Sequence, residues 1–284
     1  MRVRSTMGAA LLLALAGCGG GGGGHGDSDD FVSPVDAGDV PDLAGAIADG
    51  SGFVAPAQAT VTGRSSTVVI EQGGSIRIRV PGDTLQRYYT PTSTVSNIET
   101  YQSYDASDFL IKNTVGQGFG DSFDLNYVSF GVWAESDVAD LLMADDPRII
   151  DAAPFYIAVP TPRNQMPLTG AASYRGGVLG VETDGDRMKA VLVGSINAQA
   201  DFLRGNIYAT ATLKERDGGA WGTVTMPDIA INGTKFSSEN VTASTGHKGE
   251  VNGIFAGPDA QEIAGTMVLK GDTTVRASLA ARQY

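Results

Sequence analysis

The sequence predicts an all-β protein, in which a C-terminal eight-stranded antiparallel up-and-down β-barrel follows a small β-rich subdomain. Three observations predict this fold. Segments in which apolar and polar residues alternate follow one another through residues 121–284, as expected for strands with one buried face. Short turns rich in Gly, Asp and Asn separate these segments, which is typical of an antiparallel meander. The chain has 38 glycines and only 18% charged residues, a composition that favours turns and strands over long surface helices.

The N-terminus has the pattern of a bacterial export signal, predicted over residues 1–17. Arg2 and Arg4 precede the apolar stretch 7–15, which is shorter than the roughly 18 residues that a membrane-spanning helix needs. The stretch ends in Leu-Ala-Gly before Cys18, the only cysteine. This resembles a lipobox and predicts Cys18 as the lipid-attachment residue; the alternative is an ordinary signal peptide with a chance cysteine. A single cysteine excludes an internal disulfide and a cysteine-cluster metal site.

Residues 18–52 are predicted to form a flexible tether. They begin with unbroken glycine over 19–24 and continue with the acidic run 27–30, and glycine-rich chain behaves as a flexible spacer. Within the tether, the sequence favours only a weak helix over 40–48 as an ordered element. Together with lipidation of Cys18, the tether predicts a protein held to a membrane by acyl chains.

Residues 53–120 are predicted to form the small N-terminal β subdomain. Strands at 67–70 and 75–80 flank a Gly-Gly turn and predict a hairpin. Residues 81–120 are polar and tyrosine-rich, so we expect long loops there with one strand at 109–112.

Residues 121–284 are predicted to form the barrel. About eight strands of this length, joined by short turns, can close around an interior filled by side chains, and closure removes the edges that promote aggregation. One helix is expected at about 135–144, where Val138, Leu141 and Leu142 share a face. Charges scattered through the strands, and few aromatic residues, argue against a barrel that faces lipid. The expected strands are 125–135, 155–159, 171–181, 190–200, 205–214, 222–231, 250–256, 263–270 and 274–281.

Four motifs in the C-terminal half carry a resemblance to a known family. The first is Tyr127-x-x-Phe130-Gly131-x-Trp133, and the second is Pro-Thr-Pro at 160–162 followed by Met-Pro at 166–167, Gly170, Ala172, Tyr174 and Gly176. The third is Ala-Asp-Phe at 200–202 with Gly205, and the fourth is the stretch 249–266. In this order they resemble the β-barrel domain of transferrin-binding protein B and related surface lipoproteins of Gram-negative bacteria. One departure is Ala256, where the family often has an aromatic residue.

The motif residues are best explained by the fold. Glycines such as Gly131, Gly176 and Gly253 let strands bend or large neighbours pack, and Trp133, Tyr174 and Phe255 offer large apolar areas to a core. The resemblance implies a single-lobe relative with a handle-like subdomain before the barrel. It implies a place on the Gram-negative outer membrane, lipid-anchored at the cell surface, and a non-enzymatic function in binding haem or a host iron or metal protein, with an outer-membrane transporter as a further partner. A shared barrel does not by itself identify the ligand.

Four residues are candidates for ligand binding. Tyr101 and Tyr104 offer phenols that suit haem ligation or a protein interface, with loop packing as the alternative. His247 lies in a glycine-flanked turn, as a haem ligand or an exposed turn residue, and Arg163 follows Pro-Thr-Pro in a polar loop. The acidic runs 27–30 and 145–146 lack the spacing of a calcium loop, so no metal site and no resident cofactor are predicted.

Enzymatic and nucleic-acid functions are disfavoured. The formal net charge is −12, whereas nucleic-acid binding needs a basic surface. The sequence has no Gly-x-Ser-x-Gly, His-Glu-x-x-His or phosphate-loop motif. The hypothesis is a surface binding protein for haem or for a transferrin-like or haemoglobin-like host protein. The alternative is a structural or adhesive surface lipoprotein without a small-molecule ligand, and a hydrolase with an unrecognised acidic site is a third interpretation.

Overall fold

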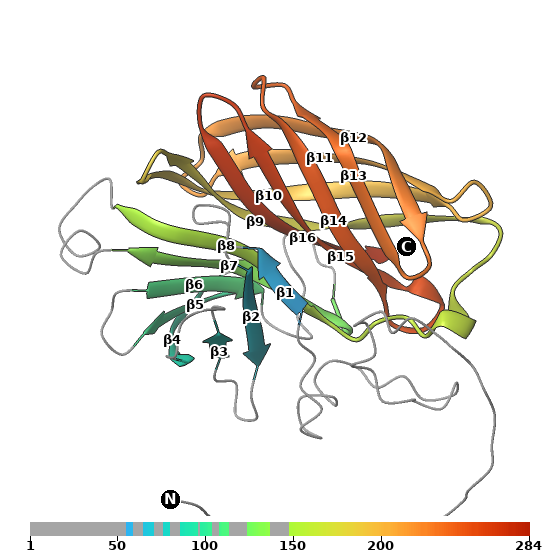
Figure 1. Ribbon diagram of the computed structural model, residues 1–284, viewed down its shortest axis with the longest axis horizontal. Coiled ribbons are helices and arrows are strands. Elements are labelled where there is room, and N and C mark those ends of the chain that lie inside the picture. Colours follow the sequence, from blue (N-terminus) through green and yellow to red (C-terminus); the bar gives the residue numbers. More distant parts are fainter. Residues whose placement is uncertain are drawn as a thin grey trace, which may run out of the picture. The chain divides into compact units, whose positions relative to one another are not determined.

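The described part of the chain consists of two antiparallel β-sheets, which confirms the predicted fold class (Figure 1). One sheet has eight strands in sequence order, and the other is a closed eight-stranded barrel. The computed structural model describes residues 55–58, 65–70, 76–79, 86–95, 97–103, 108–113, 124–136 and 148–284. Cys18, the tether, the expected helix beyond Ser136, Tyr104 and both acidic runs lie outside these residues.

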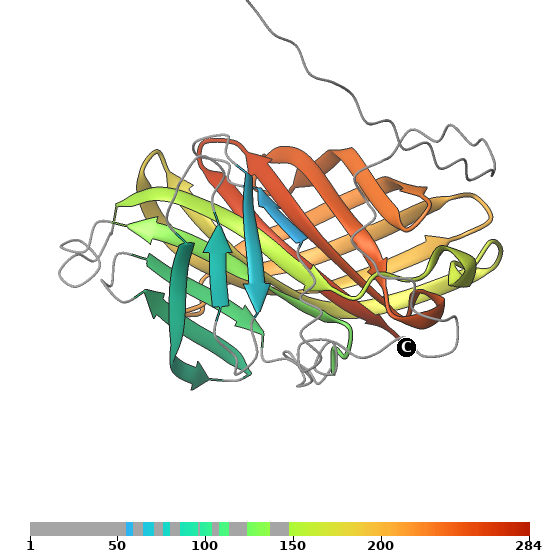
Figure 2. The ribbon, with the colours of Figure 1, turned by 60° about the horizontal axis from the view of Figure 1, so that its bottom comes forward.

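The eight-stranded sheet is a meander in which each strand pairs with the next. The predicted hairpin is present, since β2 pairs with β3. Two strands, β4 and β5, occupy a stretch for which sequence analysis expected long loops, and the observed β6 contains the expected strand 109–112. Figure 2 shows these strands in blue to green. The strands are β1 (Ala55–Gln58), β2 (Ser65–Ile70), β3 (Ile76–Arg79), β4 (Gln86–Val95), β5 (Ile98–Ser103), β6 (Asp108–Asn113), β7 (Val128–Ser136) and β8 (Ile149–Ala158).

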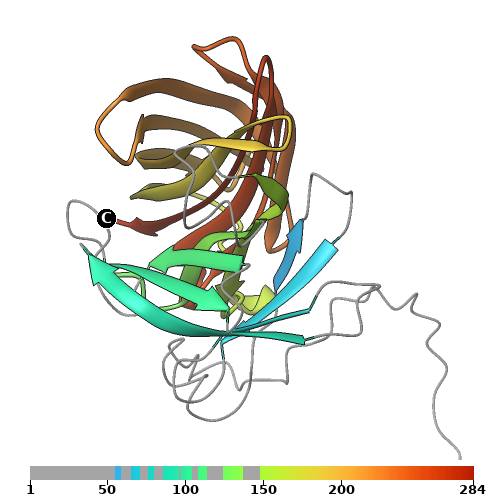
Figure 3. The same cartoon turned by 90° about the vertical axis from the view of Figure 1, so that its left-hand side faces the viewer.

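The barrel closes because its first and last strands pair with each other. Figure 3 shows this ring in yellow to red. Its tight turns use glycine with positive φ, such as Gly185 between β9 and β10 and Gly233 between β12 and β13, where other residues would be strained. The strands are β9 (Ala171–Asp184), β10 (Arg187–Asp201), β11 (Asn206–Glu215), β12 (Ala220–Asn232), β13 (Lys235–Ala243), β14 (Lys248–Ala256), β15 (Glu262–Lys270) and β16 (Thr274–Gln283).

Two strands that sequence analysis assigned to the barrel belong to the other sheet. β7 and β8 pair with each other, β7 also pairs with β6, and neither is a strand of the closed barrel, which begins at β9. Their described side chains are almost all buried, because both faces of these strands are covered. Trp133 is therefore a core residue of the eight-stranded sheet and not of the barrel. Alternation and turns show that a segment is a strand but do not show which sheet it joins.

The strand that completes the barrel is β13, which the sequence analysis did not identify. Only Phe236 and Val241 among its nine residues are buried. The remaining residues, including Ser237, Ser238, Glu239 and Asn240, give no apolar alternation, so the segment has the composition of a polar loop.

The interior of the barrel is packed with apolar side chains. Alternate residues of all eight strands form one buried cluster, in which Tyr174 and Phe255 are the largest fully buried members. A cavity in this core measures about 10 Å³, which is on the order of a single water molecule. Gly176 permits close strand approach, since a Cβ there would lie 2.0 Å from the carbonyl oxygen of Ala280.

The outer face of β15 and β16 is also buried. Ala264 and Ala280 pack in one apolar cluster with Phe130 of β7 and with Tyr156 and Ala158 of β8. This explains why nearly every residue of β15 and β16 is buried, on both faces of the barrel wall. The barrel and the eight-stranded sheet therefore share an apolar interface.

Glu262 is a buried carboxylate at this interface. Its two oxygens accept hydrogen bonds from the backbone N–H groups of Asn126, at 2.7 Å, and Tyr127, at 2.9 Å. Burial raises the pKa of Glu262 to about 7, although these backbone hydrogen bonds and the nearby Arg282 act in the opposite direction. The side chain thus joins the start of β15 to the segment that leads into β7.

Candidate functional site

Exposed apolar side chains gather at one end of the barrel, at its rim formed by residues 159–170, 202–205 and 284. Leu168 is 84% exposed, Leu203 is 73% exposed and Tyr284 is 70% exposed. The backbone brings these segments together, because Phe202 N–H donates to the carbonyl of Gly170 at 3.0 Å. Tyr284 N–H likewise donates to the carbonyl of Ser173 at 3.2 Å. Single exposed apolar side chains are common on proteins, whereas several of them at one end of a fold are typical of an interaction site.

An aromatic cluster supports the rim from inside the barrel. The ring of Phe255 lies 5.6 Å from that of Phe202, 5.6 Å from that of Phe236 and 6.3 Å from that of Tyr174, measured between centroids. The hydroxyl of Tyr174 donates to the carbonyl of Ala260 at 2.7 Å, and burial raises the pKa of this tyrosine. These contacts hold the base of the rim in one arrangement, so a partner would meet a preorganised surface.

The segment that carries Arg163 is tied to the barrel as well. Thr161 donates from its hydroxyl to the carbonyl of Gly257 at 2.7 Å and from its N–H to the carbonyl of Phe255 at 3.0 Å. Arg163 follows in a short 3₁₀ turn, Arg163–Gln165, and is exposed to solvent. Among the candidates that the structure describes, Arg163 is therefore the one that lies on the rim.

Two further arginines accompany the exposed apolar residues. Arg175 lies over the ring of Tyr284, with 4.8 Å between its guanidinium carbon and the ring centroid. Arg204 is adjacent to Leu203 and pairs with Asp201 at 3.6 Å. Arginine and tyrosine are enriched where proteins bind other proteins. The rim of this acidic chain thus combines apolar, aromatic and cationic groups.

His247 lies at the opposite end of the barrel and is buried, with 6% of its surface exposed. Its Nε2 contacts the hydroxyl of Thr273 at 2.7 Å, and that hydroxyl donates to Oε1 of Glu182 at 2.6 Å. Its Nδ1 contacts the hydroxyl of Thr245 at 2.9 Å, and its ring lies 5.3 Å from that of Trp221. Both ring nitrogens are engaged within the protein, so the exposed turn position that was one alternative for His247 is wrong.

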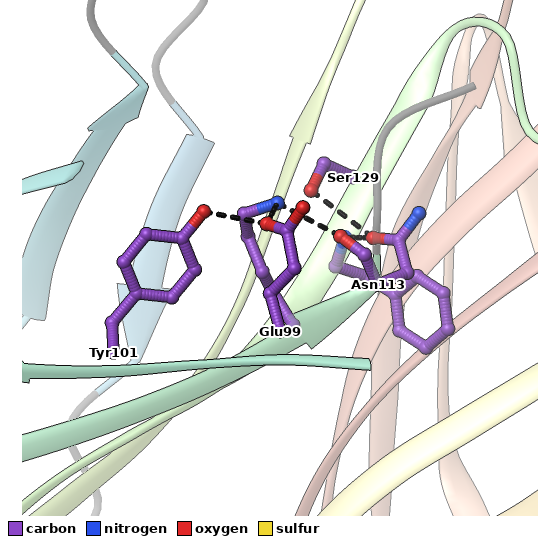
Figure 4. A network of polar contacts seen from close by, with 6 residues as sticks. Glu99, Tyr101, Asn113 and Ser129 are labelled. Atoms are coloured by element: carbon purple, nitrogen blue, oxygen red, sulfur yellow. Dashed lines mark hydrogen bonds and ion pairs between the residues drawn. The ribbon is translucent and has the colours of Figure 1, made fainter. Parts of the chain in front are cut away.

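Tyr101 belongs to a second buried network, in the eight-stranded sheet (Figure 4). Its hydroxyl donates to Glu99 at 2.5 Å, and Glu99 also forms an ion pair with Lys112. Burial lowers the pKa of Lys112, although Glu99 opposes this shift. Asn113 continues the network by accepting hydrogen bonds from the Ser129 hydroxyl at 3.1 Å and from the N–H of Phe130 at 2.7 Å. Tyr101 is thus a core residue, and the structure brings none of the three described candidates, Tyr101, Arg163 and His247, together with another.

Within the described ranges, no group of three or more His, Cys, Asp or Glu side chains could hold a metal ion. No helix among those same residues is long and apolar enough to cross a membrane. The sequence analysis missed Leu168, Leu203 and Tyr284. A leucine beside a turn was the available signal for the first two, but only the structure shows that their side chains are exposed.

Residues 166–283 match the family described as the C-lobe and N-lobe beta barrels of Tf-binding protein B. The barrel is similar to the barrels of this family. This confirms the resemblance based on the four motifs. Transferrin-binding protein B of Haemophilus influenzae is 25% identical over 169 residues, which cover 52% of this chain and 26% of that protein. The chain thus matches about a quarter of the length of this relative.

Solved structures with a similar arrangement include transferrin-binding protein B of Haemophilus parasuis, in a mutant form, at 15% identity and a TM-score of 0.47. That match covers 78% of this chain and 51% of the solved chain. A second is the N-lobe of lactoferrin-binding protein B of Moraxella bovis, at 16% identity and a TM-score of 0.39, covering 59% and 78% of the two chains. A third, described as a surface lipoprotein, is 14% identical with a TM-score of 0.41 and covers 82% and 98%.

Proposed function

We propose that this protein is a lipid-anchored, surface-exposed binding protein that captures a host iron-carrying protein of the transferrin or lactoferrin type. The observation that carries the proposal is the barrel rim, where Leu168, Leu203 and Tyr284 are exposed next to Arg163 and Arg204. The filled barrel interior supports recognition of a macromolecule at the surface. The family of the barrel, and the names of its relatives, support an iron-carrying protein as the partner.

The lipid anchor at Cys18 and the outer-membrane location are part of this proposal. The flexible tether expected from the sequence would let the rim face the medium. Haem is the alternative ligand. His247 and Tyr101 both have their polar atoms engaged inside the protein, so a macromolecular partner is favoured over direct haem ligation by these two residues.

The test is a binding measurement with the immobilised full chain against transferrin, lactoferrin, haemoglobin and free haem. We expect saturable binding of transferrin or lactoferrin. Leu203→Asp should weaken it at least about tenfold, because loss of a side chain on which binding depends costs about 2 kcal/mol or more. Ala220→Asp introduces the same charge at an exposed position at the other end of the barrel and should leave the affinity unchanged.

Binding to none of the four probes would refute the proposal and favour a structural or adhesive surface lipoprotein. Equal affinity of the Leu203→Asp and Ala220→Asp variants would show that the partner binds elsewhere.

A further inference from the structure

A groove runs over the outer face of the barrel, beside Tyr156 of β8. It has a volume of about 300 Å³, and its described lining comes from β8, the β12–β13 turn, β13, β14 and β15. This volume lies at the lower end of the range for small-ligand sites. The groove is separate from the rim residues Leu168, Leu203 and Tyr284, none of which lines it.

A row of polar side chains crosses three strands in the groove. Ser237 of β13 is the register partner of Asn252 of β14, and Asn252 is the register partner of Thr266 of β15. Direct cross-strand neighbours have Cβ atoms about 5 Å apart, so the three groups span about 10 Å. Burial increases along the row, from exposed Ser237 through half-buried Asn252 to Thr266, which is 4% exposed.

The polar groups of this row have no partners within the described part of the protein. The side chains of Ser237, Asn252 and Thr266 make no hydrogen bond to another described residue, and neither does the hydroxyl of Tyr156. Tyr156 is only 9% exposed, and burial raises its pKa to about 12, so its hydroxyl remains a donor. Neither this hydroxyl nor that of Thr266 is among the buried unpaired polar atoms of the described residues, so both are open to the groove, where a ligand can hydrogen-bond to them in place of water.

The described lining of the groove is polar but almost uncharged. Hydroxyl and amide groups can both donate and accept hydrogen bonds, and the lining contains no carboxylate and a single cationic residue, Lys235. Ile254, which is half-buried, adds an apolar surface between the polar groups. Such a surface suits a ligand that has several hydroxyls, no net charge and patches of C–H groups.

We propose that this groove binds a neutral saccharide of one or two rings. The row from Ser237 to Thr266 hydrogen-bonds the sugar hydroxyls, and Ile254 packs against a C–H face of a ring. The hydroxyl of Tyr156 donates from the β8 side. This site is independent of the proposed recognition of an iron-carrying protein at the rim.

The test uses saturation-transfer difference NMR on the full chain in a detergent without sugar head groups. The probes are maltose, lactose and N,N′-diacetylchitobiose, which represent α-glucans, galactoside-bearing glycans and N-acetylated glycans. We expect saturable transfer to at least one of them, and the sugar that responds identifies its source. Tyr156→Phe combined with Thr266→Val removes two hydroxyls with little change in shape and should weaken binding at least tenfold.

The matched control is Thr212→Val, the same substitution at an exposed position on β11, which should bind like the wild type. Transfer that is absent for all three sugars at tens of millimolar would overturn the proposal and leave water as the occupant of the groove. Transfer that is equal in the double variant and the wild type would place the sugar elsewhere and would equally refute this site.

Discussion

The carboxylate of Glu262 should make the protein less stable as the pH rises from about 5 to 8. In the folded state its pKa is about 7, against an ordinary value of 4.5. The folded protein therefore binds a proton more readily than the unfolded chain, and deprotonation penalises folding. A difference of about 2.5 units at about 1.4 kcal/mol per unit gives about 3 kcal/mol. This penalty is absent below pH 4.5, grows between 4.5 and 7, and is complete above 7.

The assay is urea denaturation at pH 5 and pH 8, followed by tryptophan fluorescence of Trp133 and Trp221. Glu262→Gln resembles the protonated side chain at both pH values. Relative to wild type, its free energy of unfolding should therefore be about 2.5 kcal/mol higher at pH 8 than at pH 5, because part of the penalty is already present at pH 5. Glu239→Gln, at an exposed position of β13, provides the control and should show no such difference. If Glu262→Gln tracks the wild type at both pH values, the carboxylate is not titrating in this range and the reasoning fails.

Three further predictions concern packing, the buried ion pair and the anchor. Gly176→Ala should destabilise the barrel by about 3 kcal/mol in thermal or urea unfolding, because its Cβ would lie 2.0 Å from the backbone oxygen of Ala280. A loss of stability below about 0.5 kcal/mol would contradict the close approach of β9 to β16 at this position. Lys112→Met should cost about 1–3 kcal/mol, because half-buried Glu99 loses its cation, and adding Glu99→Gln should recover part of that stability. Cys18→Ser should abolish incorporation of labelled palmitate into the protein, and incorporation that persists would reject Cys18 as the attachment residue.

The fold class was predictable because several barrel strands can be recognised from their own residue pattern. β11 and the second half of β10 alternate between core and solvent, β12 does so over most of its length, and these strands are separated by recognisable turns. β13 could not be found in this way, since two buried residues in nine provide no periodicity. Its position is determined by pairing with β12 and β14, and such long-range pairing is not encoded in a local pattern.

The functional residues were less predictable than the fold. Of the candidates, Arg163 lies on an exposed rim, whereas His247 and Tyr101 are part of buried networks. A histidine between glycines resembles a solvent-exposed turn in the sequence. Its burial depends on Thr273 and Glu182, which approach from distant positions in the chain. The interface around Glu262 was equally hidden, because a glutamate that starts a strand gives no sign that another sheet will cover it.

The pairing of β9 with β16 has a consequence for when the barrel can close during synthesis. The partner that seals β9 is synthesised about a hundred residues later. Until that segment has emerged, β9 has one open side, and the outer wall that receives β7 and β8 is incomplete. During synthesis the barrel therefore cannot be completed from its N-terminal strands alone. Closure of the barrel therefore has to follow synthesis of β16.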